Sequence, residues 1–282
     1  MFLCYKKTMN RADYICYEPG LLDRFPVTNS PNYPLNPQVA RFCLPLGANI
    51  ECWRTGSSNT NITKSTFVLN VLNVGKVYGS SISFYEEYEE SLLTEEQANL
   101  LRLSQYTNKG ERKIMANKCI CLLSQWPFFD AFEKFLFFIY KRLLMGPFDI
   151  PIERYISHFL YHVPFPSPER PRILLKLSDL DSIALYQPQE LALPRSGANF
   201  RLLVTSLDPD NCLLLLVLAL TEQKILLHSL RPDVVTAVCE ALMQIIFPFY
   251  WTGTYIPLCP MGEGNLLNFP NFFSSFSEYH VI

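Results

Sequence analysis

The sequence lacks the motifs of the common nucleotide-binding and hydrolytic enzymes. The dipeptide Gly75-Lys76 has neither the earlier glycine nor the following serine or threonine of a phosphate-binding loop. The G-x-S-x-G turn of the α/β-hydrolases is missing as well. These absences favour a binding function over covalent catalysis, and we expect no catalytic residue.

The chain also lacks an excess of basic charge. Its 282 residues include 24 lysines and arginines against 26 aspartates and glutamates, which gives a net charge of −2 at pH 7. Proteins bind nucleic acid through many cationic contacts to phosphate groups. Nucleic-acid binding is therefore the least favoured class of function that we consider, and we expect no nucleic-acid partner.

No cysteine pair has the C-x-x-C spacing of a zinc or redox motif, and the nine cysteines are an odd number. We interpret them as reduced, mostly buried thiols. Cys119 and Cys121 are expected to point to opposite faces of a strand. His158 and His162 would share one face of a helix but have no third ligand nearby, so we expect no metal and no cofactor.

No long apolar segment is present either. Met1 to Asn10 has no stretch of signal-peptide length, so we expect a cytoplasmic protein whose sequon at Asn61 is not glycosylated. The opening residues indicate a fragment of a longer chain, although a natural start remains open. The apolar run Cys212–Leu220 is too short to cross a bilayer, and we expect it to be buried in the core.

Hydrophobic residues make up 49% of the chain and aromatic residues 14%, which predicts a globular protein of about two lobes. The first 25 residues are either an edge strand or the exit from a preceding domain. A proline-rich linker, Pro26–Pro37, marks an expected boundary. The elements predicted after it are strands at Thr66–Asn70, Lys76–Tyr85 and Lys118–Ser124, a helix from Thr94, a mobile basic loop at Asn108–Asn117, an aromatic helix from Pro127 to Gly146, and a helix at Ile152–His162.

The second half of the sequence predicts a parallel strand–helix–strand crossover. A short apolar strand, Ile225–His228, precedes a helix that begins at Pro232 and carries apolar residues at three- and four-residue spacing. Tyr255–Pro260 is the next strand, so the two strands are expected to be parallel. Strands at Arg172–Leu177 and Ser182–Leu185 and a helix at Asn199–Leu207 are predicted upstream.

Several separate blocks of the sequence resemble the DENN family, and within it the type 4 DENN domain-containing proteins. The blocks are Phe42–Gly47 with Glu51 and Trp53, Cys119–Phe129, Pro164–Pro168 with Arg170–Arg172, Thr221–Pro232, and Phe247–Trp251 with Tyr255–Pro260.

The resemblance implies a mixed α/β (α+β) fold with two lobes. The expected ranges are an N-terminal flank at 1–24, a longin-like lobe at 25–163 with an antiparallel sheet and helices, a central α/β lobe at 164–260 with a partly parallel sheet, and a divergent tail at 261–282. The tail departs from the family pattern. We interpret it as a truncation or alternative end that leaves the central sheet incomplete, with an uncovered edge.

The resemblance also implies a guanine nucleotide exchange factor for Rab GTPases. Such a module binds the nucleotide-free GTPase across both lobes and promotes GDP release, with no covalent chemistry, and truncation would impair it. It would reach vesicle membranes only through its GTPase. The alternative is a non-catalytic scaffold that binds a Rab or another protein. The candidate partner-binding residues are Glu222, Lys224, His228 and Arg231. The alternative is that Glu222, Lys224 and Arg231 are helix-end and loop charges and that His228 is a partly buried, hydrogen-bonded histidine.

Overall fold

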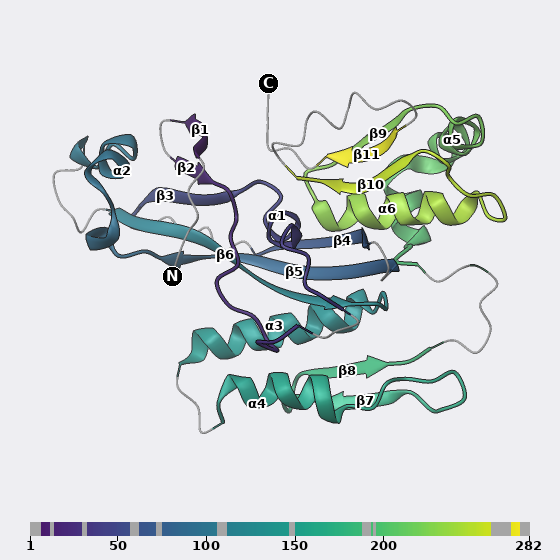
Figure 1. Ribbon diagram of the computed structural model, residues 1–282, viewed down its shortest axis with the longest axis horizontal. Coiled ribbons are helices and arrows are strands. Elements are labelled where there is room, and N and C mark those ends of the chain that lie inside the picture. Colours follow the sequence, from purple (N-terminus) through teal and green to yellow (C-terminus); the bar gives the residue numbers. More distant parts are fainter. Residues whose placement is uncertain are drawn as a thin grey trace.

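The computed structural model describes residues 7–11, 14–29, 33–56, 62–71, 75–105, 112–146, 150–187, 193, 196–260 and 272–276. Within these residues two lobes lie against each other (Figure 1). The larger contains an antiparallel sheet with the strand order β1-β2-β3-β6-β5-β4, and the smaller a sheet with the order β10-β11-β9. The expected mixed α/β fold is confirmed.

The large sheet brings together segments from the first 124 residues. Its strands are β1 (Lys7–Arg11), β2 (Tyr14–Tyr17), β3 (Ala48–Arg54), β4 (Thr63–Val71), β5 (Gly75–Glu87) and β6 (Arg112–Ser124). The three predicted strands are confirmed, whereas β3 had not been predicted. The predicted loop at Asn108–Asn117 is wrong from Arg112 onward, because these residues pair with both β3 and β5 as the first half of β6. The preceding residues 108–111 lie outside the described part.

The proline-rich segment Pro26–Pro37 connects two parts of one sheet. The strand before it, β2, pairs antiparallel with β3, which follows it, and β1 pairs with β2 at the edge. The interpretation of the first residues as edge strands is therefore confirmed. The segment in which we expected a boundary lies inside the larger lobe, and the division into the four ranges stays a prediction.

Helices cover both faces of the large sheet (Figure 1). On one face lies α3 (Phe129–Met145), which buries its own side chains Phe132, Phe135 and Phe138. On the other face lies the short α1 (Val39–Cys43). The predicted start at Thr94 is confirmed, since its side chain forms a capping box with Gln97 at the start of α2 (Glu95–Leu100). Short 3-10 turns occupy Glu90–Leu92 and Leu103–Gln105.

A second layer lies beyond α3. The predicted helix at Ile152–His162 is confirmed as α4 (Ile152–Ser157) followed by a π-helical turn (His158–His162). The predicted strands at Arg172–Leu177 and Ser182–Leu185 form an antiparallel hairpin, β7 (Ile173–Lys176) with β8 (Ser182–Leu185). Ile183 and Leu185 of β8 pack against α3, so this hairpin lies on the side of α3 away from the sheet (Figure 1).

The smaller lobe contains the predicted crossover. Its elements are α5 (Phe200–Leu220), β9 (Ile225–His228), α6 (Pro232–Ile245), β10 (Thr254–Cys259) and β11 (Phe272–Phe276). Both β9 and β10 run parallel to β11, which lies between them, so the parallel crossover is confirmed. The tail that was expected to leave the sheet incomplete instead contributes β11, its central strand.

The expected burial of Cys212–Leu220 is wrong. Leu213, Leu214 and Val217 are 62%, 57% and 56% exposed, because only the opposite side of α5 packs against β9 and α6. Among the described residues, α5 is one helix that is long and apolar enough to cross a membrane, and 11% of its most apolar window is buried. The helical backbone is interrupted at Asp208, before Pro209, which agrees with the predicted helix end at Leu207. Each of the two helical parts is therefore shorter than the roughly 20 residues that a membrane-spanning helix needs.

Cys119 and Cys121 lie on the same face of β6, so their predicted opposite orientation is wrong. Side chains two residues apart on a strand point to one face. Both cysteines pack against the apolar cluster that contains Cys43 of α1.

Candidate functional site

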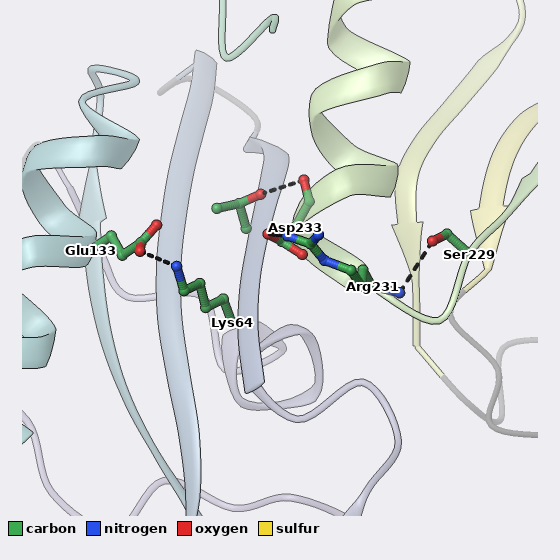
Figure 2. A network of polar contacts seen from close by, with 6 residues as sticks. Lys64, Glu133, Ser229, Arg231 and Asp233 are labelled. Atoms are coloured by element: carbon green, nitrogen blue, oxygen red, sulfur yellow. Dashed lines mark hydrogen bonds and ion pairs between the residues drawn. The ribbon is translucent and has the colours of Figure 1, made fainter. Parts of the chain in front are cut away.

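The two lobes meet where α6 lies against β4, the edge strand of the large sheet. The Thr236 hydroxyl of α6 donates a hydrogen bond to the backbone carbonyl oxygen of Thr66 on β4. In the reverse direction, the Thr66 hydroxyl donates to the carbonyl oxygen of Asp233 at 3.5 Å (Figure 2). Thr236 is fully buried. Polar contacts therefore hold the start of α6 against the edge of the large sheet.

A buried carboxylate extends this junction along α6. Glu240 is only 1% exposed and accepts a hydrogen bond of 2.8 Å from the Tyr255 hydroxyl of β10. Its other oxygen lies 3.8 Å from the ammonium group of Lys76 on β5, which belongs to the other lobe. Burial, together with the negative charge of Glu240, raises the pKa of Tyr255 well above its ordinary value. The Glu240 carboxylate thus links α6 to β10 through a hydrogen bond and to the larger lobe through an ion pair with the half-exposed Lys76.

These junction residues were missed when only the sequence was considered. Asp233, Thr236, Glu240 and Gln244 follow one another at spacings of three and four, so they line one face of α6. The apolar periodicity of the same helix predicts only the packing of its apolar face. A polar stripe on a helix with so many buried residues would have indicated a buried polar contact with another element.

The four candidate partner-binding residues lie at two ends of β9. Glu222 and Lys224 precede the amino end of the strand, and His228 and Arg231 are at and beyond its carboxyl end. All four side chains belong to exposed residues. Because β9 spans four residues, roughly 13 Å at the usual rise, the structure divides them into two pairs and does not bring them together.

Glu222 of the amino-end pair is held by the loop before β10. Glu222 has a positive φ of 56° and accepts a hydrogen bond of 2.9 Å from the Thr252 hydroxyl. Aromatic side chains are exposed in the same loop, among them Tyr250, which is 81% exposed. This end of the sheet therefore combines a fixed carboxylate with exposed aromatic surface.

The carboxyl-end pair lies beside the lobe junction. Arg231 precedes the first residue of α6, and its guanidinium lies 3.0 Å from the Asp233 carboxylate (Figure 2). Its backbone N–H donates to the Ser229 hydroxyl at 3.2 Å. Since the Asp233 carbonyl oxygen contacts β4, Arg231 is within reach of both lobes, and carboxyl ends of parallel strands are common binding positions.

The predicted histidine pair makes no metal site in the described part of the chain. The rings of His158 and His162 stack with their centroids 5.5 Å apart. Among the described residues, no three His, Cys, Asp or Glu side chains are arranged to hold a metal ion.

Comparison with known proteins identifies the family of this chain. The model of the DENN (AEX-3) domain matches residues 115–273, more than half of the chain, and the uDENN domain model matches residues 19–84. The first match ends inside β11, so the family pattern continues past residue 261, where we expected the chain to depart from it. The more specific assignment to type 4 stays a prediction.

A curated relative supports the match. The DENN domain and WD repeat-containing protein SCD1 of Arabidopsis thaliana is 30% identical over 247 residues, which cover 86% of this chain and 20% of the relative. The chain thus spans about a fifth of the length of that protein. On the strength of the two domain matches and the two-lobed α/β fold, this chain belongs to the DENN family.

Proposed function

We propose that this chain is a guanine nucleotide exchange module for a Rab GTPase. DENN domains are in general exchange modules for Rab proteins, and this chain matches both the uDENN and the DENN models. The observation that supports the proposal is the lobe junction, where the buried Thr236 of α6 is hydrogen-bonded to β4 and Glu240 of α6 is paired with Lys76 of β5. A partner that touches both lobes would therefore meet them in one fixed arrangement.

The proposed mechanism is thermodynamic coupling. If the module binds the empty GTPase more tightly than the GDP-bound form by some factor, then its binding must weaken GDP by the same factor. Shape and contact area supply this preference. No residue of the module has to form a bond with the nucleotide.

Of the two pairs of candidate residues, we propose that His228 and Arg231 contact the GTPase. Arg231 is two residues from Asp233, whose carbonyl oxygen contacts β4, and His228 is the last residue of β9, whereas Glu222 and Lys224 precede the first residue of that strand. Arg is frequent among the residues that dominate binding at protein interfaces. If truncation of Arg231 removes about 1.4 kcal/mol or more of binding free energy, exchange should slow by about tenfold or more.

The test is GDP release from a panel of purified Rab proteins with this 282-residue chain. We expect acceleration for at least one Rab, with reduced rates for His228→Ala and Arg231→Ala. Lys176→Ala is the matched control, because Lys176 is an exposed cation on β7, far from β9 (Figure 1). No acceleration for any Rab would reject exchange activity, and equal loss with Lys176→Ala would reject the assigned contacts.

A second candidate function is binding without exchange. The exposed apolar side of α5 and the exposed aromatic residues before β10 favour it, because exposed apolar patches often mark protein contacts. Capture of a nucleotide-free Rab with no change in the GDP release rate would support this candidate. Capture together with faster release would support exchange instead.

We further propose that the protein is cytoplasmic and is recruited to vesicle membranes by its GTPase. The net charge of −2 offers no general attraction to anionic lipid. Flotation with liposomes should therefore depend on a membrane-attached Rab. Equal flotation with and without the Rab would contradict this route.

A further inference from the structure

Three thiols gather between α1 and the large sheet. Cys43 is the last residue of α1 and is buried in an apolar cluster with Phe67 of β4 and Val77 of β5. Cys119 and Cys121 of β6 pack against the same cluster and share one face of their strand. Eight of the nine cysteines lie in the described part of the chain, and these three come from distant segments to one place.

The three thiols are neighbours in this cluster. Interaction with Cys119 and Cys121 shifts the pKa of Cys43, and interaction with Cys43 and the Ser81 hydroxyl shifts the pKa of Cys119. The interaction with Cys119 favours the Cys43 thiolate, but the interaction with Cys121 and burial outweigh it, so the pKa of Cys43 is raised. The interaction with Cys43 and burial raise the pKa of Cys119. At neutral pH these two thiols are protonated, which is the state expected of a reduced pair.

We propose that this cluster is a reversible oxidation site, in which Cys43 forms a disulfide with Cys119 or Cys121. The three side chains pack in one apolar cluster, so two of their sulfur atoms can approach to the disulfide bond length of about 2 Å. Cys43 has two neighbouring partners, so the bond can pass between them by thiol–disulfide exchange.

Hydrogen peroxide can supply the oxidising equivalents. One thiol releases its proton and its sulfur attacks a peroxide oxygen, so that the O–O bond breaks and a sulfenic acid forms. The departing hydroxide takes up the released proton and becomes water. The second thiol then attacks the sulfenic sulfur, an S–S bond forms, and the second water leaves. Two thiols lose two electrons in total, and one peroxide becomes two waters.

The disulfide would fasten α1 to β6 close to the second lobe. The cluster that contains Cys43 and Val39 of α1 also contains Leu258 of β10, so α1 packs where the lobes meet. We expect the amide hydrogens of α1 to exchange more slowly in the oxidised protein, because local opening of the helix would be restrained.

The experiment treats the folded full chain with hydrogen peroxide, blocks the remaining thiols, and digests it with trypsin and Glu-C. Cleavage after Glu51 separates Cys43 from Cys52, so the bond appears as a linked pair of the peptides Phe42–Glu51 and Cys119–Glu133. We expect this pair to disappear on treatment with dithiothreitol. Mass spectrometry gives its abundance relative to the unlinked peptides.

Cysteine variants identify which two sulfur atoms form the disulfide. Cys43→Ser and Cys43→Ala should each reduce the linked pair at least tenfold, as should the double change Cys119→Ser with Cys121→Ser, whereas either single change on β6 should leave it. Cys212→Ser is the control, because Cys212 is another half-buried cysteine and lies on α5. Circular dichroism of each variant establishes that it is folded.

Two outcomes would overturn the proposal. One is that Cys43 is fully alkylated, once the protein has been unfolded, after peroxide treatment that oxidises half-buried thiols such as Cys52 and Cys212. The other is that oxidation joins Cys119 to Cys121, or either of them to a cysteine outside the cluster, and leaves Cys43 reduced.

Discussion

Removal of the Tyr255 hydroxyl should destabilise the protein, because this hydroxyl donates a hydrogen bond to the buried carboxylate of Glu240. In Tyr255→Phe, the Oε1 atom of Glu240 loses a hydrogen bond of 2.8 Å in a position where the side chain is 1% exposed. The loss of a hydrogen bond to a buried charged group costs about 1.5–3 kcal/mol. With an unfolding entropy of about 2.1 cal/mol/K per residue, this corresponds to a drop in Tm of about 3–5 °C for a chain of this length.

Urea unfolding followed by tryptophan fluorescence measures the free energy of unfolding. Tyr250→Phe is the matched control, because it removes the same hydroxyl from an exposed residue and should change stability by less than about 0.5 kcal/mol. The double variant Tyr255→Phe with Glu240→Gln should lose less than the sum of the two single changes, since the residues contact each other. A loss below 0.5 kcal/mol for Tyr255→Phe would refute the reasoning.

The pH dependence gives a second measurement of the same contact. The pKa of Tyr255 is raised in the folded protein, so the unfolded chain releases this proton first, from about pH 10. The stability that the protonated Tyr255 contributes is complete below that pH and falls as the pH rises toward the folded pKa, by about 1.4 kcal/mol per pH unit. Stability of the Tyr255→Phe variant should fall less steeply above pH 10. Parallel alkaline curves for the two proteins would contradict the assignment.

Three further changes test other parts of the structure. Asp208 has a φ of 61° and a ψ of 156°, a region that suits glycine, so Asp208→Gly should raise the free energy of unfolding by about 1 kcal/mol, and a decrease would contradict the kink. Gly79→Ala should destabilise by about 3 kcal/mol in urea unfolding, because the added methyl group would overlap the buried Phe67 ring, and Phe67→Leu in the same chain should restore part of the loss. The hydrogen bond from Lys141 lowers the pKa of Asp181, so the stabilisation is present above about pH 4 and is lost as the pH falls below it. Asp181→Asn should therefore lower stability at pH 7 by less than about 1 kcal/mol and have no effect near pH 2, and an equal effect at both would refute the ion pair.

The sequence was most informative where local signals agree. The crossover was predicted almost to the residue because Pro232 starts the helix, apolar residues recur along one face, and both flanking strands are short and apolar. The capping box at Thr94 was equally local. Separate sequence blocks also indicated the DENN family, which the comparisons confirmed.

The sequence failed where a segment's role depends on its neighbours. The run Cys212–Leu220 was expected in the core because it is apolar on all sides, but α6 and β9 cover only one side of α5. Arg112–Asn117 was assigned to a loop because it is basic, but pairing with β3 and β5 makes it a strand. A basic side chain is compatible with a strand whose face is partly open to solvent.

By itself, the sequence determined the types of most elements and the family, since helix starts, strand lengths and turn residues act over a few positions. Tertiary structure alone decided the contacts made at long range. It placed β11 between β9 and β10, set the polar face of α6 against β4, and brought Cys43 to the two cysteines of β6. The physical reason is that burial and pairing are properties of two surfaces in contact, and one segment specifies only its own surface.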